Sequence, residues 1–321
     1  LEGSTPREMA AKGLFLPVDD ALRGLRFTPA DVTEMTYKGK MYAAPFFTTT
    51  RGLLKRVDAF AESGLDANAD PTSMAQLKAW SDKLTVRNSD GTYKRVGFIP
   101  WGTNWGAPGW MWSFGGELVD ASGIHPTATD PNNVRAFEWL REWAQPFNGK
   151  SPVPAGAGGF QNGTIAMNTD STSAVGRLVN AKVNFTTGPV PHDAAGSNGT
   201  WGGGQAFAIP VNAAHPVEAM QFLRYMNTPE VQIARFKQFP QLLPANWDAL
   251  QAIAPDLPAV YGPMLAQFPE ARARTPLWID YYVNQLRPAV TAVITGKKTP
   301  QQALADVQQV MVQRYKDVFG E

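Results

Sequence analysis

The sequence predicts an α/β protein with two domains. Its first two thirds alternate short apolar segments of strand character with segments of helical periodicity, and the last third is almost wholly helical in pattern. The chain has 321 residues, of which 44% are hydrophobic, so it has material for more than one core. We therefore expect alternating strands and helices, followed by a helical C-terminal region.

Capping residues and prolines mark the expected helices. Ser4 and Pro6 open a short helix that ends before Gly13, and Asp130 caps a helix that starts at Pro131. The expected helices are 7–12, 72–84, one from 131, one from about 171, 216–226, 229–237, 244–253 and two long segments ending at Ile294 and Phe319. The expected strands are a hairpin turn within 37–45 leading into a strand that ends in 46–51, then 96–99, 164–167, 183–190 and one within 201–210. The stretch 151–163, rich in Pro, Gly and Ala, is an expected loop.

Composition excludes several classes of function. The formal charge is +1 and no basic block stands out, so nucleic acid is not an expected partner. The chain has no cysteine, and its three histidines do not pair at metal-ligand spacing, so neither thiol chemistry nor a metal site is expected. It has no run of about 18 apolar residues, so no membrane span is expected.

Four tryptophans stand among glycines and small polar residues between Trp101 and Trp112. Glycine and proline cost helix stability, roughly 1 and 3 kcal/mol relative to alanine, so at least part of this run is expected to be loop. Indole faces presented from a loop can stack on an uncharged ring, and Asn104 can hydrogen-bond its hydroxyls. The run is therefore a candidate sugar site, with aromatic packing under a glycine-rich turn as the alternative. Packing is the expected role of Trp110 and Trp112, which are two residues apart and cannot share one helix face.

An enzyme remains an alternative at this point. A glycosidase needs two carboxyl groups about 5–10 Å apart across a sugar site. The carboxylates near aromatic segments are Glu117, Asp120, Asp170 and Asp280. A cap or a surface charge is the favoured interpretation of each, so no catalytic residue is predicted.

The chain resembles family 1 extracellular solute-binding proteins, the receptors of bacterial ABC importers for carbohydrates, and is similar to maltose-, trehalose- and glycerol-3-phosphate-binding proteins. The resemblance rests on five landmarks in the right order over nearly the whole length. They are Tyr37-Lys-Gly-Lys-Met-Tyr-Ala-Ala-Pro45, Ala166-Met167, Gly203-Gly-Gln-Ala-Phe-Ala-Ile-Pro210, Pro229-Glu-Val-Gln232 and Gly296-Lys-Lys-Thr-Pro-Gln-Gln-Ala-Leu304. The transfer from fold to function is an analogy.

The sequence departs from the family pattern in two places. After the first hinge strand it reads Lys55-Arg56-Val57-Asp58, where the family has tyrosine, asparagine or arginine before lysine and aspartate. The family also places a signal peptide, a strand, a helix and a strand before the segment that corresponds to Leu1. We therefore expect the residues shown to be an N-terminally incomplete version of a longer protein, with a natural degenerate or rebuilt lobe as the alternative. We also expect Leu1 to lie within or at the end of a central strand or cleft segment.

The resemblance implies a two-lobed, type II periplasmic-binding-protein-like fold. Lobe one comprises residues 1–47 and 206–241 and is expected to be incomplete. Lobe two comprises residues 48–205 and 242–321. Three crossings, near 48–51, 202–206 and 241–244, connect the lobes and act as hinges. Ligand binds in the cleft between them.

The resemblance also implies roles for particular residues. Trp105 falls where an aromatic residue stacks on sugar, and Arg51 falls at the first crossing, where the alternative role is to satisfy hinge carbonyls. The full set of candidate ligand residues is Trp105, Asn104, Trp101, Thr49, Arg51, Asp170, Ser171, Trp201, Gly203, Trp278, Tyr281, Glu2 and Ser4.

Three functions compete. The first is a sugar or oligosaccharide receptor of an ABC importer, periplasmic or extracellular, with a lipid anchor through the missing N-terminus as one option. Its partners are the carbohydrate and the ABC permease subunits, and it needs no cofactor and no metal. The second is a receptor for a phosphorylated polyol such as glycerol 3-phosphate, which would need several donors converging on the phosphate. The third is a glycosidase-like sugar enzyme.

Overall fold

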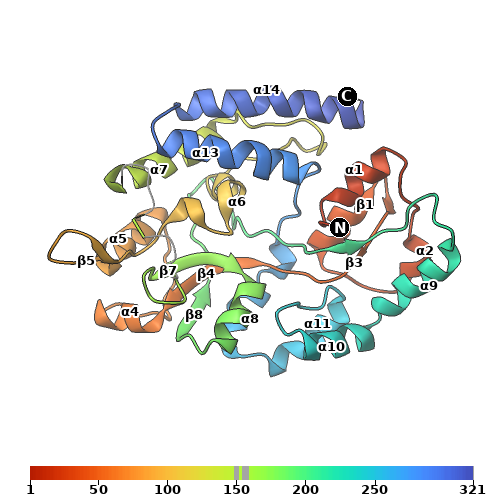
Figure 1. Ribbon diagram of the computed structural model, residues 1–321, viewed down its shortest axis with the longest axis horizontal. Helices are drawn as coiled ribbons and strands as arrows, with labels where there is room; N and C mark the ends of the chain where they lie inside the picture. Colours follow the sequence, from red (N-terminus) through yellow and green to blue (C-terminus); the bar gives the residue numbers. More distant parts are fainter. Residues whose placement is uncertain (148–151, 154–158, 321) are drawn as a thin grey trace.

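The computed structural model describes residues 1–147, 152–153 and 159–320, so the expected loop at 151–163 lies partly outside the described residues. Two sheet-containing regions lie beside each other, and the long C-terminal helices run along one side of the molecule (Figure 1). The region at the right of Figure 1 contains the segments assigned to lobe one, and the region at the left contains most of lobe two. Mixed strands and helices with a helical C-terminal region agree with the α/β prediction.

The largest sheet lies in lobe two and has three antiparallel strands in the order β7-β4-β8. Its central strand is β4, and five of its six residues are buried. The strands of this sheet are β4 Arg51–Arg56, β7 Met167–Ser171 and β8 Phe185–Gly188. Lobe one has one short antiparallel pair, β3 Ala44–Pro45 with β9 Ala206–Phe207. Two further two-stranded ribbons are β1 Thr36–Tyr37 with β2 Lys40–Met41, and β5 Val86–Arg87 with β6 Tyr93–Arg95.

The expected lobe boundaries divide the helices into two sets. Those within the bounds expected for lobe one are α1 Thr5–Ala11, α2 Asp19–Leu22, α3 Pro29–Met35, α9 Pro216–Met226 and α10 Pro229–Gln238. Those of lobe two are α4 Val57–Glu62, α5 Met74–Leu84, α6 Gly106–Ser113, α7 Pro131–Ala144, α8 Thr172–Asn180, α11 Trp247–Ile253, α12 Gly262–Leu265, the π-helix η6 Ile279–Leu286, α13 Arg287–Ile294 and α14 Pro300–Phe319. Short 3-10 turns occur at Pro100–Gly102, Gln145–Phe147, Ala254–Asp256, Ala259–Tyr261 and Phe268–Glu270.

Several expected elements are displaced by local chemistry. The helix expected from residue 244 begins at Trp247, because the Asn246 side chain caps it by accepting a hydrogen bond from the Ala249 amide at 3.0 Å. The strand expected at 96–99 is not present, since β6 ends at Arg95 and only Val96 forms an isolated bridge, with Ile165. The strand expected at 164–167 starts only at Met167. Residues 103–105 of the tryptophan run are irregular, in agreement with the expectation that part of the run is loop, whereas α6 begins at Gly106 despite the glycines and proline that follow.

Packing explains the helix at α6. All eight of its residues are buried, so tertiary contacts outweigh intrinsic propensity. Gly109 is required because a Cβ there would lie 2.4 Å from Cδ1 of the Trp105 ring. The glycine that disfavours the helix in isolation therefore lets the helix lie against an indole.

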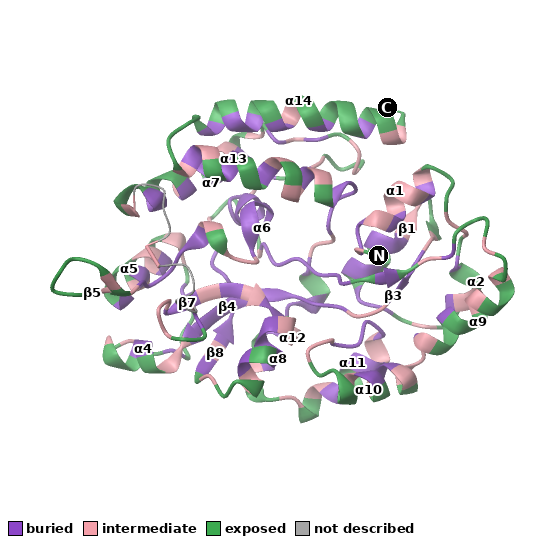
Figure 2. Ribbon diagram, in the orientation of Figure 1, coloured by how far each residue is buried: buried purple, intermediate pink, exposed green. Residues whose placement is uncertain are grey.

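Most of the apolar core belongs to lobe two. One continuous cluster joins β4, α5, α6, α7 and the C-terminal helices, and its members include Trp105, Trp110, Trp112 and Trp143. The segments expected for lobe one contribute to two small clusters, one around Leu22 and Ile209 and one around Met35. A further cluster is shared across the expected boundary, because α10 packs there with residues of α11 and β4. Figure 2 shows the difference, with largely buried strands in the three-stranded sheet and mostly exposed or intermediate residues on α9.

The three expected crossings lie side by side. The Thr48 amide donates to the Leu243 carbonyl at 3.1 Å, and the Thr49 hydroxyl donates to the Gly203 carbonyl at 2.6 Å. Leu1 is half-exposed and exchanges backbone hydrogen bonds of 2.9 Å with Ala206, so it lies along β9. In the described part of the chain, no helix combines the length and the apolarity needed to cross a membrane.

Candidate functional site

Three aromatic rings form a cluster beside the crossings, and we call Trp201, Trp278 and Tyr282 the aromatic cluster. The Trp278 ring centroid lies 5.0 Å from that of Trp201 and 5.1 Å from that of Tyr282. Trp201 comes from the second crossing, whereas Trp278 and Tyr282 come from the start of the C-terminal helices. The cluster therefore joins segments that are far apart in the chain at the place where the lobes meet.

Arg51 lies against this cluster. Its guanidinium carbon is 3.1 Å from the ring centroid of Trp201, and Nη1 donates to the Thr49 hydroxyl at 2.8 Å and to the Trp201 carbonyl at 2.9 Å. Burial lowers the pKa of Arg51 to about 9, and the nearby cation Arg274 lowers it as well. The expected alternative role, satisfying hinge carbonyls, is thus present, but Nε of Arg51 has no partner in the structure.

A second group of predicted residues meets at the end of β7. The Asn104 side-chain amide donates to the Asp170 carboxylate at 3.0 Å, and the Ser171 amide donates to the same oxygen at 2.8 Å. Next to them, Oγ1 of Thr172 and Nε1 of Trp105 are buried without a hydrogen-bond partner. Buried polar atoms normally have partners, so these atoms mark a place where a polar ligand would be stabilised.

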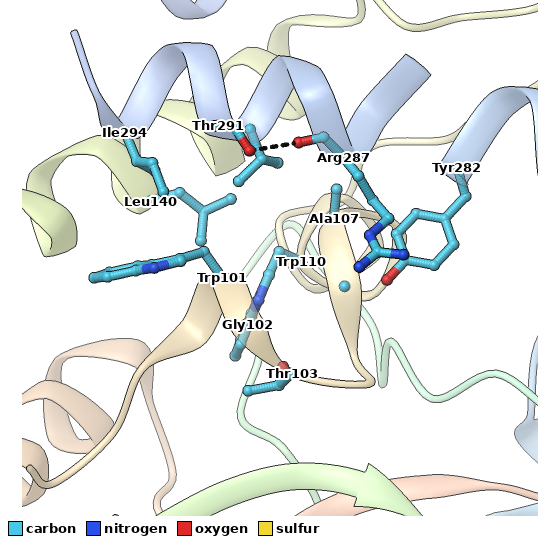
Figure 3. A pocket seen from close by; sticks show the side chains of 12 residues that line it. Trp101, Gly102, Thr103, Ala107, Trp110, Leu140, Tyr282, Arg287, Thr291 and Ile294 are labelled. Atoms are coloured by element: carbon cyan, nitrogen blue, oxygen red, sulfur yellow. Dashed lines mark hydrogen bonds between the residues drawn. The ribbon is translucent and has the colours of Figure 1, made fainter. Parts of the chain in front are cut away.

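One cavity of about 170 Å³ opens on one side of the cluster. Figure 3 shows Trp101 at one end and the side chains of Tyr282 and Arg287 at the other, with Thr103 between them at the near edge. Burial raises the pKa of Tyr282, against the influence of Arg287 and Arg51, so its hydroxyl stays a neutral donor. Arg287 is exposed, and its guanidinium has no ion pair within the described ranges.

A second cavity, of about 240 Å³, lies on the other side of Trp278. Its walls come from the first helix, α1, and from the residues around the start of the π-helix. The lining residues are Ser4, Thr5, Glu8, Leu277, Trp278, Ile279, Asp280 and Arg314. The predicted residues Ser4 and Trp278 therefore meet here, one from each lobe.

The remaining predicted residues, Glu2 and Gly203, lie in a buried ion cluster. Arg274 pairs with both Glu2 and Glu34, and its Nη2 is 2.6 Å from Oε2 of Glu34. Gly203 adopts φ +88° beside this pair, and a Cβ there would lie 2.2 Å from Glu34 Oε2. Both residues are next to the crossings, but they contact protein charges and neither lines the two cavities described above.

The structure corrects two assignments. The ring of Trp105 is fully buried and lies against Gly109, so it has no open face for a sugar, although its Nε1 stays unpaired. Tyr281 is also fully buried, and its hydroxyl donates to the Leu118 carbonyl at 2.8 Å, so it belongs to the core of lobe two. The ring at the cavity is that of its neighbour, Tyr282.

Tyr282 and Arg287 were missed for a definable reason. They lie in and directly after the π-helix η6, where the i→i+5 pattern shifts the face that each residue presents relative to an α-helix. The adjacent tyrosines were the available signal, but a helical period of 3.6 residues cannot say which of them faces the cavity. Single-turn π segments are frequent at functional sites, which agrees with this position.

The site does not have the features of a glycosidase. Glu117 is ion-paired with Arg272 at 2.7 Å, and Asp280 is ion-paired with Arg314. Hydrogen bonds from Ser122 and His125 lower the pKa of Asp120 to about 2, which is opposite to the raised value that a general acid needs. No group of three His, Asp or Glu side chains that could hold a metal ion occurs in the described ranges.

Three known proteins are similar to this chain. A "probable ABC transporter-binding protein" of Deinococcus radiodurans is 26% identical over 302 residues, covering 86% of this chain and 69% of the relative. The sn-glycerol-3-phosphate-binding periplasmic protein UgpB of Pectobacterium atrosepticum is 24% identical over 312 residues, covering 83% of this chain and 64% of the relative. The chain thus spans about two thirds of the length of these relatives. The structure of CpMnBP1 with mannotriose bound is 25% identical with a TM-score of 0.81, covering 97% of this chain and 84% of that one.

These comparisons confirm the expected periplasmic-binding-protein fold. A family model described as bacterial extracellular solute-binding protein matches residues 2–233, which is well over half of the chain. This chain therefore belongs to the family of bacterial extracellular solute-binding proteins, which are receptors and not enzymes, as the resemblance implied.

Proposed function

We propose that this chain binds a sugar or an oligosaccharide at the aromatic cluster and delivers it to the transmembrane subunits of an ABC importer. The observation that carries the proposal is the convergence of ring faces with unpaired buried polar atoms. Trp101 and Tyr282 line the cavity. Arg51, whose charge acts on Tyr282, has an unpaired Nε, and Trp105, the chain neighbour of the lining residue Gly106, has an unpaired Nε1. Sugars combine apolar ring faces with polar edges, so they suit such a lining. The mannotriose bound to the similar CpMnBP1 supports this substrate class.

The proposed mechanism is capture by closure of the lobes. The cavity of about 170 Å³ is smaller than the roughly 300–1,000 Å³ of common small-molecule sites, so it admits at most a small ring. All of its lining residues lie within the bounds of lobe two, so a longer ligand would have to extend beyond this cavity to reach the other lobe. A ligand that then contacts both lobes, as the walls of the second cavity allow, binds the closed form better and shifts the population toward it.

Binding of a sugar panel tests the proposal. The protein is incubated with neutral mono- and oligosaccharides while thermal shift, calorimetry and product formation are followed. A ligand should raise the melting temperature and remain unconverted. Trp101→Ala should weaken binding about tenfold, because a stacked ring contributes area burial plus roughly 0.5–1.5 kcal/mol.

The matched control is Trp80→Ala, which removes another half-buried tryptophan that packs on Phe60, away from the cavity. It should leave affinity unchanged. Sugar consumption, or no binding anywhere in the panel, would contradict the proposal.

A phosphorylated polyol is the second candidate ligand, and Arg287 is the observation that favours it. This exposed cation lines the cavity beside Tyr282 without an ion pair. Arg51 places a second cation near the same ring. A phosphate would pair with such guanidinium groups, and a curated relative is named for binding glycerol 3-phosphate.

Arg287→Gln separates the two candidates. Binding of a phosphorylated polyol should fall about tenfold or more, since hydrogen bonds to charged groups contribute roughly 1.5–3 kcal/mol. Binding of a neutral sugar should change much less. Arg177→Gln, which removes an exposed arginine of α8, is the control and should affect neither. A ligand whose affinity falls in Arg287→Gln belongs to the phosphorylated class, and a ligand whose affinity is unchanged belongs to the neutral sugars.

A further inference from the structure

We propose that the buried ion pair between Arg274 and Glu34 is a latch that holds the lobes closed, and that it sets ligand affinity without contacting ligand. The proposal rests on the proposed function, in which ligand binds the closed form. It makes Arg274 and Glu34 positioning residues, since they line neither of the two cavities at the aromatic cluster.

The pair is buried and closely hydrogen-bonded. Arg274 is 3% exposed and Glu34 has no exposed surface. Nε and Nη2 of Arg274 donate to the two carboxylate oxygens of Glu34 at 2.7 and 2.6 Å, and the Arg274 amide donates to the same carboxylate at 2.8 Å. Burial alone would lower the pKa of Arg274, but Glu34 and Glu2 raise it above its ordinary value, so the latch stays charged.

The pair connects two separate cores. Glu34 lies on α3 next to Met35, which belongs to a small apolar cluster of lobe one with Ala43 and Ala206. Arg274 lies three residues before Leu277, which belongs to the large aromatic core of lobe two. Separation of the lobes would therefore pull these two side chains apart, whereas an ion pair inside one lobe would move as a unit.

Two glycines beside the ion pair leave space for the side chains of Arg274 and Glu34. A Cβ at Gly3 would lie 2.3 Å from Nη2 of Arg274, and one at Gly203 would lie 2.2 Å from Oε2 of Glu34. Side chains at either position would therefore displace the guanidinium or the carboxylate. Two glycines, one near the start of the chain and one in the second crossing, thus leave space for one ion pair.

Hydrogen bonds link the latch to the aromatic cluster. Nη2 of Arg274 also donates to the Gly204 carbonyl at 2.8 Å. The preceding carbonyl, of Gly203, accepts from the Thr49 hydroxyl at 2.6 Å, and that hydroxyl accepts from Arg51 at 2.8 Å. The same crossing segment is thus held by the latch on one side and by Arg51 on the other.

The energetics favour a conformational role over a large contribution to folding. Desolvation of a buried ion pair can offset its Coulomb attraction, so such pairs are weak evidence for stability. Opening of the lobes would pull the two side chains apart, so each would exchange its hydrogen bonds to the other for hydration. Because apparent affinity scales with the population of the binding-competent form, a latch that favours closure tightens binding.

The test is the double variant Arg274→Met with Glu34→Gln, which removes both charges of the latch and keeps an acceptor for the amide of residue 274. It leaves Glu2 without its ion pair, but that side chain is 30% exposed and can be hydrated. Small-angle scattering without ligand should show a larger radius of gyration than the unmodified protein. The sugar found in the panel should bind about fivefold more weakly or worse, with a faster dissociation rate. Arg274→Lys keeps the charge but loses the planar guanidinium that binds both carboxylate oxygens, so its effect on the radius of gyration and on affinity should be intermediate. This variant replaces the double variant if the double variant does not fold.

The matched control is Lys55→Met with Asp70→Asn, which removes an ion pair of 2.6 Å within lobe two whose lysine is also fully buried. It should change the melting temperature but neither the radius of gyration nor the affinity. A folded latch variant with unchanged radius and affinity, or a control with the same changes as the latch variant, overturns the proposal. The ligand-free radius tests the latch even if no sugar binds, so failure of the latch and failure of the proposed function remain distinguishable.

Discussion

The interior of lobe two and the interior of lobe one are stabilised by different kinds of contact. Lobe two has an aromatic core in which the Trp139 ring centroid lies 4.8 Å from that of Trp110 and 4.9 Å from that of Trp143. Lobe one relies on buried polar contacts, such as Gln232 donating to Asn227 at 2.9 Å and the Thr28 hydroxyl donating to the Asp31 carboxylate at 2.5 Å. The aromatic lobe also carries Trp101, Trp278 and Tyr282, the rings offered for ligand, on the elements that form that core.

The difference matters for a receptor that must open and close. Apolar packing is non-directional and tolerates small displacements, so it can fix the ring faces in any state of the molecule. Hydrogen-bonded charges satisfy each other in one geometry only, so they distinguish one arrangement of the lobes from another. We infer that lobe two holds its side of the site in one fixed arrangement. The buried charges of lobe one, in contrast, form their contacts only when the lobes are closed.

Loss of an aromatic ring from lobe two should have the largest effect on stability. Phe137 on α7 is fully buried, so Phe137→Ala should lower the free energy of unfolding by about 3–5 kcal/mol in urea titrations. The counterpart in lobe one, Leu223→Ala, should cost about 2 kcal/mol, the low end of its class, because its neighbour Phe222 is exposed and the site can collapse. Equal losses would remove the contrast between the two cores.

The pH dependence of stability should come from lobe one. Burial and the nearby Glu34 raise the pKa of Asp31 from its ordinary 3.8 to about 7, and its Oδ1 has no partner. The folded state therefore holds a proton that the unfolded state releases. The stabilisation that this proton brings is complete below pH 3.8 and is lost as the pH rises through 7.

Asp31→Asn removes this dependence. The variant should gain stability over the unmodified protein as the pH rises from 4 to 7, by up to roughly 4 kcal/mol, and the gain should level off above pH 7. Urea titrations at pH 5, 6, 7 and 8 would measure it. Asp256→Asn, at an exposed carboxylate, should show no such trend. A flat difference across the series would contradict the buried, protonated state of Asp31.

The helices that begin with proline were predictable from sequence, because proline fits the first turn and its missing donor is not needed there. The helix 216–226 was predicted with the bounds of α9, and 229–237 differs from α10 by one residue. The helix at α6 was not predictable, since its glycines are accommodated by the Trp105 ring, a contact that local pattern does not contain.

The site was predictable in part for a related reason. Asn104 was named because it stands among the tryptophans and can hydrogen-bond a sugar, and Asp170 because the resemblance places it in the turn that faces the cleft. The two side chains form a hydrogen bond. The ion cluster was missed because Glu2 and Glu34 lie 272 and 240 residues from Arg274 in the chain. No local pattern relates charges at such separations, and the π-helix displaced the assignment from Tyr282 to Tyr281.

Gly203→Ala should sharpen the contrast at the boundary of the lobes. Its φ of +88° costs an alanine roughly 1–2 kcal/mol, and the added Cβ would overlap Glu34 and Arg274. Gly24→Ala is the matched control, because Gly24 has φ +81° with nothing within 4 Å of an added Cβ. Gly203→Ala should therefore lower the free energy of unfolding by more than Gly24→Ala. Equal losses in urea titrations would mean that the ion pair adjusts freely and does not constrain the crossing.

The smallest effect on stability should come from the outer face of lobe one. Phe222 on α9 is 52% exposed, and its main aromatic contact is the partly exposed Phe207, with ring centroids 6.3 Å apart. A side chain that remains in water gains little from folding, so Phe222→Gln should change the free energy of unfolding by no more than about 0.5 kcal/mol. In lobe two, Trp139→Gln should cost several-fold more, because its ring contacts Trp110 and Trp143. A loss above about 1.5 kcal/mol for Phe222→Gln would mean that this face is covered in solution, since only burial gives an aromatic ring that much folding energy. Sedimentation velocity of both proteins would then show whether a second molecule supplies the cover, as a dimer that dissociates in the variant.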